Sequence, residues 1–343
     1  MAVTIRDIAK KAGVSRGTVD RVLHNRKGVN ESVAKRVRDI ADEMGFTPNL
    51  AGKVLARRKQ PLRIGCLLPS IGNPFFDEVI AGFRQAEREL GDFGVIVDIT
   101  QIKSFDLDVH LHELKRLAAQ QYDGVCVTTL DVQSIVDAID EITKSGTAVA
   151  TVNTDIDSMH RLFYVGPDYY LAGRTASGLL VVSGNGGKKR ILIVTGSFNM
   201  KGHQERIRGF LDGLQAHKAD FALVDTVECL DDDTCAYERT RKCLEQHPEI
   251  NCIYLTAAGV QGACQAVKDL GRENTLRILS FDDVPVTRSL VKEGIITFTI
   301  CQQPHKHGYD AIHKLFNHLM DQQGPLVDTI TQTIIKIREN IEE

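Results

Sequence analysis

The segment SRGTVDRVLHN, residues 15–25, places charged side chains at helical spacing near the start of the chain. A guanidinium group can donate two parallel hydrogen bonds to O6 and N7 of guanine in the major groove of DNA. Arg16 and Arg21 are therefore candidates for reading a base, and a phosphate contact or a solvated charge is the alternative for each. Base readout is favoured for Arg21, whereas the two alternatives are balanced for Arg16.

Asp20 lies between these arginines, and its carboxylate cannot donate a hydrogen bond to a phosphate. It can accept from the N4 amine of a cytosine, or it can pair with Arg16 four residues earlier and hold that side chain in one rotamer. Repulsion of non-target sites is a third possible role. An exposed charge that DNA binding merely tolerates is the fourth.

Three short helices would position these side chains. Apolar residues recur at helical spacing in TIRDIAKKA, with Thr4 as the N-cap. A second helix would begin after Ser15 and bury Val19 and Val22. The segment VNESVAKRVRDIADEMG would form a third helix, capped by Asn30. This order predicts an all-α helix-turn-helix domain.

The charge of the chain is divided unevenly. Residues 1–60 contain 14 lysines and arginines against 6 acidic residues, a net charge of +8, whereas the remaining residues carry −11. A basic segment on an acidic body indicates a polyanionic partner for that segment alone. Because the basic segment also has apolar periodicity, a solvated basic tail is the weaker interpretation.

Composition and cysteine usage narrow the class of protein. The chain is 43% hydrophobic and 25% charged, which is typical of a soluble globular protein. We find no apolar run of about 18 residues and no signal-type start, so a cytoplasmic protein without membrane contact is expected. The eight cysteines contain no C-x-x-C pair, and we expect reduced, mostly buried thiols without a functional role.

From residue 62 the pattern changes to alternating strands and helices. Seven apolar runs predict buried parallel strands: LRIGCLLPS, VIVDIT, GVCVTTL, TAVATVN, RILIVTGS, CIYLTA and LRILSFD. Amphipathic segments separate them at 75–90, 106–120, 131–144, 202–217 and 259–270. About 280 residues of this pattern predict a doubly wound α/β body in two lobes.

The basic segment resembles the DNA-binding domain of the lactose-repressor (LacI/GalR) family of bacterial regulators. The matching motifs are TIRDIAKKAGVSRGTVDRVLHN and VNESVAKRVRDIADEMGFTPN. The resemblance implies an operator-binding head in which Thr4, Ser15, Thr18 and Asn30 contact phosphates. Gly17 stands where family members often carry a larger base-reading side chain, and Asp20 stands where a small hydroxyl is usual.

The resemblance continues into the hinge motif NLAGKVLARR, which includes Asn49 and Lys53. Leu55 falls where the family uses a leucine wedge that enters the minor groove at the centre of the operator. Packing of Leu55 against the body is the alternative. The basic side chains of the hinge would add salt-dependent phosphate contacts: Lys53, Arg57, Arg58 and Lys59.

The body resembles type I periplasmic sugar-binding proteins, from about residue 62 to residue 337. The motif GNPFFDEVIAGFRQAEREL carries the sharpest likeness. The resemblance implies a site for a small carbohydrate-like effector, built from Asn73, Phe75, Phe76, Asn153, Asp155, Arg206, Asp282 and Gln302. Packing beneath a helix is the alternative for the two phenylalanines. Ala257 and Ala258 stand where ribose- and galactose-type binders commonly show an Asn-Asp pair, which makes ribose itself a poor candidate.

No catalytic, metal or cofactor site is expected. The histidines at 110–112 and 305–318 lack zinc spacing, and GNGGKKR lacks the Ser or Thr of a phosphate-binding loop. The sequence therefore predicts a transcriptional regulator, expected to be a repressor, that acts as a homodimer on double-stranded operator DNA. The sugar-like effector is expected to control its operator affinity. A solute-binding protein or a sugar-processing enzyme on the same scaffold is the alternative function.

The expected domain organisation has three parts. Residues 1–47 form the head, residues 48–61 the hinge helix and linker, and residues 62–343 the two-lobed α/β body of periplasmic-binding-protein type I. Lobe 1 is expected to comprise about 62–163 plus 303–322. Lobe 2 is expected to comprise about 164–302 plus 323–343.

Overall fold

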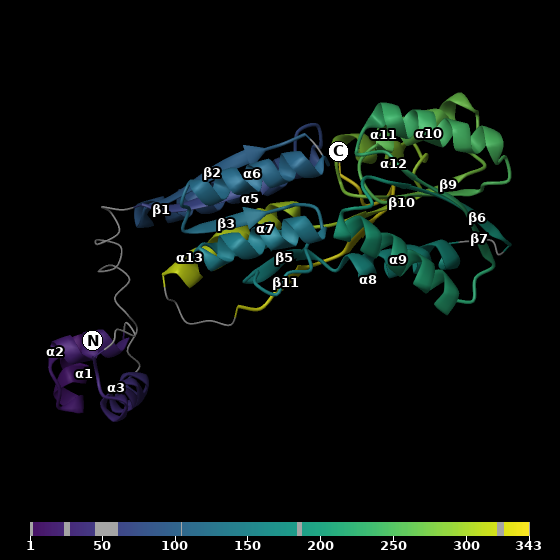
Figure 1. Ribbon diagram of the computed structural model, residues 1–343. Coiled ribbons are helices and arrows are strands. Elements are labelled where there is room, and N and C mark those ends of the chain that lie inside the picture. Colours follow the sequence, from purple (N-terminus) through teal and green to yellow (C-terminus); the bar gives the residue numbers. More distant parts are fainter. Residues whose placement is uncertain are drawn as a thin grey trace. The chain divides into compact units, whose positions relative to one another are not determined.

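The computed structural model describes residues 3–23, 28–44, 61–103, 105–183, 187–320 and 326–342. The chain divides into two compact units, residues 1–59 and 60–343 (Figure 1). Asn49, Lys53 and Leu55 of the expected hinge lie outside the described residues, as do Arg57, Arg58 and Lys59. The wedge and phosphate roles of these residues therefore stay predictions.

The first unit contains three described helices: α1 (Ile5–Ala12), α2 (Arg16–Leu23) and α3 (Glu31–Glu43). Thr4 caps α1 in a capping box with Asp7, and Gly13 ends the helix in a left-handed conformation with φ 65°. The helices share a small core of apolar residues that includes Ile8, Val19 and Val37. Helix positions expected from the apolar periodicity are thus present in the structure.

The second unit holds two six-stranded sheets, one in each lobe. The sheet of lobe 1 has the strand order β11-β5-β4-β3-β1-β2, and that of lobe 2 the order β12-β10-β9-β8-β6-β7. All pairings are parallel except that of β10 with β12. The strands of lobe 1 are β1 (Leu62–Leu68), β2 (Val95–Gln101), β3 (Gly124–Val127), β4 (Ala148–Val152), β5 (Phe163–Pro167) and β11 (Thr329–Thr331). The strands of lobe 2 are β6 (Lys189–Thr195), β7 (Phe221–Glu228), β8 (Cys252–Leu255), β9 (Arg277–Phe281), β10 (Phe298–Cys301) and β12 (Ile334–Lys336).

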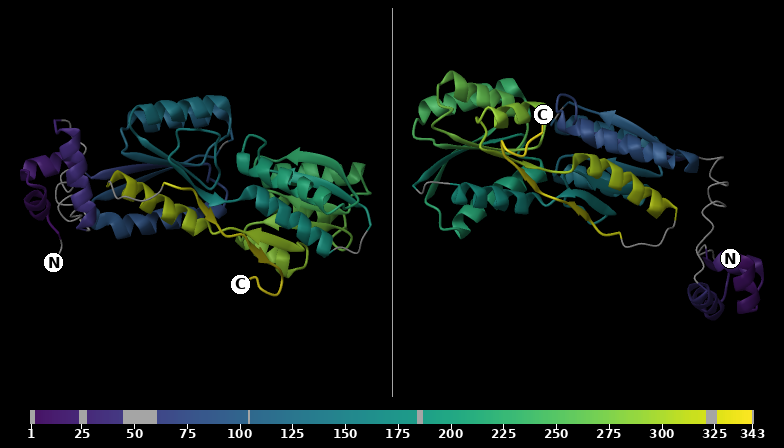
Figure 2. Two further views of the ribbon diagram at one scale, coloured as in Figure 1. Left: turned by 90° about the horizontal axis from the view of Figure 1, so that it is seen from below. Right: turned by 180° about the vertical axis from the view of Figure 1, so that it is seen from behind.

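Helices cover both faces of each sheet (Figure 2). In lobe 1, α6 (Leu107–Ala119) and α7 (Gln133–Lys144) bury their apolar faces on one side, and α5 (Phe75–Leu90) and α13 (Pro304–Leu319) pack together on the sheet as well. A 3-10 helix, η1 (Gly91–Phe93), follows α5. In lobe 2, α8 (Tyr169–Val182) and α9 (Lys201–Ala216) share one core with the sheet. The helices α10 (Asp233–Gln246), α11 (Val260–Asp269) and α12 (Pro285–Lys292) share the other. No helix in the described part of the chain is both long and apolar enough to span a membrane.

The boundaries between the lobes differ from those expected. Strand β5 pairs with β4, so lobe 1 extends to Pro167 rather than ending at about residue 163. Strand β11 pairs with β5 in lobe 1, and only β12 pairs with β10 in lobe 2, so the last crossing lies after Thr331 rather than near residue 322. Both corrections have the same physical reason. Backbone hydrogen bonds to a neighbouring strand determine which lobe each of these short strands belongs to, and their amino-acid composition does not show it.

Candidate functional site

One face of α2 presents the candidate DNA-reading residues to solvent. Arg16, Gly17 and Arg21 are exposed, whereas Val19 and Val22 are buried against the other two helices. This division agrees with the expected amphipathic helix. Asp20 is only half exposed, at the border between the two faces. A role in base reading stays a prediction for all of these residues.

The polar residues expected to contact phosphates also cap helices. The hydroxyl of Ser15 accepts a hydrogen bond from the Thr18 amide at 3.1 Å, and Asn30 Oδ1 accepts from the Ser32 amide at 2.9 Å. The Thr4 hydroxyl donates to Asp7 Oδ2 at 2.6 Å, so a phosphate would compete with Asp7 for that proton. Capping fixes where these side chains lie, and it leaves the amide group of Asn30 as a further donor.

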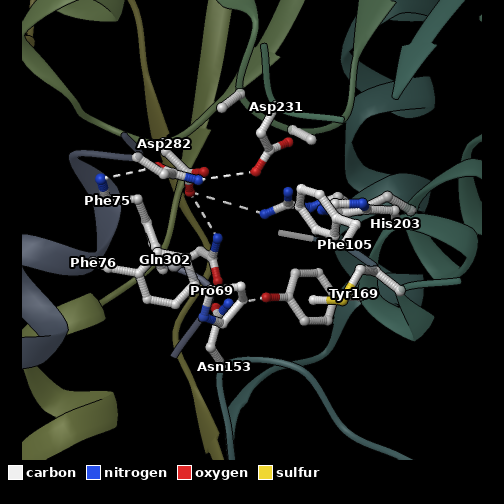
Figure 3. A pocket seen from close by; sticks show the side chains of 15 residues that line it. Pro69, Phe75, Phe76, Phe105, Asn153, Tyr169, His203, Asp231, Asp282 and Gln302 are labelled. Carbon is white, nitrogen blue, oxygen red and sulfur yellow. Dashed lines mark hydrogen bonds and ion pairs between the residues drawn. The ribbon is translucent and has the colours of Figure 1, made fainter. Parts of the chain in front are cut away.

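A pocket in the second unit brings most of the effector candidates together (Figure 3). Its empty volume, counted out to the open mouth, is about 410 Å³. Seven of the eight predicted residues line it: Asn73, Phe75, Phe76, Asn153, Arg206, Asp282 and Gln302. Both lobes contribute, and we call this cavity the central pocket.

Three polar residues of the central pocket share an unusual backbone conformation. Asn153 follows β4, Asp231 lies just beyond β7 and Asp282 follows β9, with φ values of 64°, 58° and 70°. Asn and Asp adopt this left-handed region more readily than other non-glycine residues, at a small energetic cost. The left-handed turns occur at the carboxyl ends of strands, where open α/β sheets bind ligands.

Arg206 is almost fully buried in the pocket wall, with 3% of its surface exposed. Its Nη1 donates to the Thr256 carbonyl at 2.5 Å, and its guanidinium lies 3.7 Å from the ring centroid of Phe281 and 4.7 Å from that of Tyr169. Its Nε and Nη2 have no hydrogen-bond partner among the described residues. Two buried donors thus face the pocket on a side chain held by a carbonyl and two aromatic rings.

Close contact between α8 and α9 fixes the position of Arg206. A Cβ atom at Gly173 would lie 2.2 Å from the Arg206 carbonyl oxygen, and one at Gly209 would lie 2.0 Å from the carbonyl oxygen of Tyr170. Only glycine permits this approach of the two helix backbones. The approach brings Arg206 on α9 against the ring of Tyr169 at the start of α8.

Two carboxyl groups lie in the pocket with Arg206. Asp282 Oδ1 accepts from Gln302 Nε2 at 2.7 Å and lies 3.9 Å from Arg206 Nη2, and burial raises its pKa. Burial also raises the pKa of Asp231, to about 6, although the amide of Asn73 donates to this carboxylate. Asp231 Oδ1 has no hydrogen-bond partner among the described residues. The pocket therefore offers buried acceptors as well as buried donors.

Asn73 joins the two lobes across the pocket. Its Oδ1 accepts from the Phe75 amide at 3.1 Å at the start of α5, and its Nδ2 donates to Asp231 Oδ2 at 3.1 Å in lobe 2. Phe75 and Phe76 are buried and meet edge to face, with ring centroids 5.4 Å apart. Both rings also line the pocket, so packing beneath a helix and a face for a sugar ring are compatible.

Two histidines in this region are uncharged. Burial lowers the pKa of His203 to about 3, and it does the same to His307. His203 Nδ1 lies 3.0 Å from the Ser197 amide nitrogen and 3.2 Å from the Ser197 carbonyl oxygen, so the backbone of Ser197 can satisfy either tautomer of the ring. His203 lines the central pocket and therefore presents a neutral imidazole there.

Asp155 does not line the central pocket, contrary to expectation. It pairs with Arg161 at 2.6 Å and accepts from the Thr151 hydroxyl, while Arg161 also pairs with Asp328 at 2.8 Å. Asp328 in turn accepts from the Tyr164 amide. This ion network ties the segment before β11 to lobe 1, so Asp155 has a structural role. The backbone turns at Asn153, which has a left-handed conformation. Asn153 therefore lies in the pocket wall, whereas Asp155 lies beside Arg161.

Several lining residues were not anticipated from the sequence: Pro69, Phe105, Tyr169, Met200, His203 and Asp231. Tyr169 donates to Asn153 Oδ1 at 2.8 Å and stacks on Arg206, so it holds two of the anticipated residues. Ala257 and Ala258, noted in the sequence for lacking polar groups, also line the pocket. Of these six residues, only Asp231 had a recognisable signal in the sequence, because it is a polar residue shortly after an apolar strand.

Comparison with known proteins agrees with this architecture. Residues 4–49 match the family of bacterial regulatory proteins called the lacI family, and residues 64–323 match the periplasmic binding protein domain. Catabolite control protein A of Priestia megaterium is 25% identical over 100% of this chain and 98% of its own length. The ribose operon repressor of Bacillus subtilis is 26% identical over 96% of this chain and 95% of its own length.

Among solved structures, GanP of Geobacillus stearothermophilus, a glucose-galactose binding protein, aligns with a TM-score of 0.76. It is 29% identical and covers 82% of this chain and 99% of its own. Two-lobed binding proteins of this kind thus share the fold of the second unit, while the first unit carries the regulatory family's DNA-binding domain. The chain belongs to the lacI family of bacterial regulatory proteins, with a periplasmic binding protein domain as its effector-binding body.

Proposed function

We propose that this regulator is a repressor that binds a pseudo-palindromic operator as a homodimer in the cytoplasm. A small neutral carbohydrate, enclosed in the central pocket, controls its affinity for the operator. The observation that carries this proposal is the convergence of Arg206, Asp282 and Asn73 on one pocket, in a chain that also has a DNA-binding head.

The chemistry of the pocket suits a ligand with several hydroxyl groups. Arg206 Nε and Nη2 can donate, and the carboxylates of Asp231 and Asp282 can accept. The rings of Phe75 and Phe76 provide apolar surface for the carbon skeleton of a sugar. A few directed polar groups on an apolar wall are typical of small-molecule sites.

The charge balance favours a neutral sugar over a sugar acid. The central pocket contains one guanidinium and two carboxyl groups, and both carboxyl groups are buried deeply enough to raise their pKa. A ligand carboxylate would add a third negative group to a site with one cation. Two like charges about 4 Å apart repel each other by about 4 kcal/mol at an effective dielectric of about 20. Neutral sugars avoid this cost.

The position of the pocket explains how an effector could act on DNA binding. Residues from both lobes line it, and the bond from Asn73 to Asp231 joins the lobes directly. A ligand that contacts both lobes favours one arrangement of the lobes over another. If that arrangement also differs in operator affinity, the two affinities are coupled reciprocally.

The test begins with a thermal-shift screen of neutral sugars, polyols and matched sugar acids. Binding of a neutral sugar, with a much weaker effect of its uronic acid, is expected. A second experiment selects the operator from random DNA and compares Arg21→Ala with Arg88→Ala, an exposed arginine of α5, in gel shifts. Loss of operator binding in the first variant alone supports the head as the reader. Binding of a sugar acid in preference to neutral sugars would contradict the effector class.

A further inference from the structure

A second pocket adjoins the central pocket and is the larger of the two. Its empty volume is about 700 Å³, against about 410 Å³ for the central pocket. The two pockets share the wall residues Pro69, Asn73, Phe105 and Asp231. The hydrogen bond from Asn73 Nδ2 to Asp231 Oδ2 therefore belongs to the wall between them. We call this second cavity the outer pocket.

Both lobes supply apolar side chains to the outer pocket. Ile71, in the loop after β1, is 49% exposed, and Leu230, in the turn after β7, is 52% exposed. Phe105 lies in the wall of both pockets and offers them a shared aromatic surface. These three side chains line the same pocket, so together they form one apolar surface, and polar residues lie beside it.

Polar groups complete the outer pocket. Lys103 and Thr234 can donate hydrogen bonds, and Asp232 and Asp233 bring carboxylates. One oxygen of each carboxylate is engaged, since Asp232 Oδ1 accepts from the Cys235 amide and Asp233 Oδ1 accepts from the Gly262 amide. The second oxygen of each remains as an acceptor for a ligand hydroxyl. The outer pocket thus combines apolar walls with donors and acceptors, as the central pocket does.

We propose that the outer pocket is a second sugar subsite and that the effector is a disaccharide. One sugar residue occupies the central pocket, and the second lies between Ile71 and Leu230 in the outer pocket. This inference rests on the proposed function, because it assumes a carbohydrate in the central pocket.

Two observations favour a linked second ring over an independent ligand. The pockets share four wall residues, so a short glycosidic link is enough to join their contents. Phe105 lines both, and an aromatic face is suited to the apolar face of a sugar ring in either position. The link would pass the Asn73–Asp231 bond, where a ligand hydroxyl can replace either partner.

The experiment blocks the outer pocket and measures two classes of sugar by isothermal titration calorimetry. Thr234→Trp introduces a large side chain at an exposed position of α10 that lines only the outer pocket. Glu238→Trp, on the same helix and in neither pocket, is the matched control. The probes are glucose, galactose and arabinose, the disaccharides cellobiose, lactose and melibiose, and nitrophenyl β-galactoside.

In the unaltered protein, one disaccharide is expected to bind at least about tenfold more tightly than either of its monosaccharides. Thr234→Trp should remove that advantage and leave monosaccharide affinity within about twofold, whereas Glu238→Trp should change neither. Thermal unfolding of both variants separates a folding defect from a blocked subsite.

Three outcomes would overturn the proposal. Equal affinity for a disaccharide and its monosaccharide would leave the outer pocket as an entrance only, with the proposed function intact. Tighter binding of the nitrophenyl galactoside than of any disaccharide would assign the outer pocket to an aromatic group. Failure of every sugar to bind would refute the proposed function itself.

Discussion

Replacement of Asp231 by asparagine should stabilise the body above pH 6 and weaken effector binding at the same time. In the structure the oxygens of this carboxyl group are shielded from solvent, Oδ2 accepts a hydrogen bond from Asn73 at 3.1 Å, and the backbone of Ala258 also stabilises the charged form. Asparagine has nearly the same shape and can still accept from Asn73. The substitution thus removes the charge and leaves the geometry nearly unchanged.

The pH dependence follows from the raised pKa of Asp231. Burial raises this pKa from 3.8 to about 6, so the folded state holds the proton more tightly than the unfolded chain does. The resulting stability is fully present below about pH 4 and is lost as the pH rises through about 6. A shift of this size corresponds to up to about 3 kcal/mol in the free energy of unfolding. Asparagine does not titrate and avoids this loss.

Urea unfolding at several pH values measures the effect. At about pH 7.5 the Asp231→Asn variant should be up to about 3 kcal/mol more stable than the unaltered protein, and the difference should vanish near pH 4. Asp157→Asn, at an exposed position in lobe 1, is the matched control and should change little. Calorimetry should show weaker effector binding by the Asp231 variant, because a carboxylate accepts from a hydroxyl more strongly than an amide does.

Two results would refute this reasoning. If Asp231→Asn were no more stable at about pH 7.5, the carboxyl group would not be destabilised by burial. If the variant were stabilised but bound the effector unchanged, Asp231 would be a pocket residue that does not contact the ligand.

Three further substitutions test the pocket and the head. Arg206→Lys keeps a charge but loses the planar fork, so effector affinity should fall by about 10- to 100-fold in calorimetry, and unchanged affinity would place the effector elsewhere. Gly196→Ala would put a methyl group 2.3 Å from Asp231 Oδ1, so effector binding should weaken and thermal unfolding should show a loss of about 1–3 kcal/mol. Gly178→Ala, with its nearest neighbour at 3.6 Å, is the control. Gly17→Ala meets only Ser15 Oγ at 3.7 Å, so it should stabilise α2 by up to about 1 kcal/mol in thermal unfolding; destabilisation would show that the space is not free.

Much of this architecture could be predicted because its signals are local. The caps at Thr4, Ser15 and Asn30 follow from residue type and from the apolar periodicity after them, and the structure has helices starting there. The buried strands could be recognised where an apolar run was long enough. Short strands such as β11 and β12, with three residues each, carry no such signal and exist because a neighbouring strand offers hydrogen bonds.

An effector-binding residue could be predicted where it directly follows the carboxyl end of a strand that points toward the pocket. Asn153 and Asp282 fulfil this condition, and both line the pocket. Asp155 is two residues further on, where the backbone has turned toward Arg161 and Asp328. Sequence position could not separate these cases, because the partner Asp328 is far away in the chain and becomes adjacent only after folding.

Asp231 shows how a polar group lost at one position can be supplied from another. Ala257 and Ala258 remove the side chains that an Asn-Asp pair would bring to the pocket. The left-handed turn at Leu230 and Asp231 directs a carboxylate to the same wall. That carboxylate fits because Gly196 has no side chain and Ala257 has a small one: a Cβ at Gly196 would lie 2.3 Å from Asp231 Oδ1 and 3.0 Å from the Ala257 Cβ. The small residues and the aspartate are therefore complementary. From the sequence alone, the missing Asn-Asp pair indicates a loss of contacts with the ligand. In the structure the carboxylate of Asp231 supplies a hydrogen-bonding group at that same pocket wall.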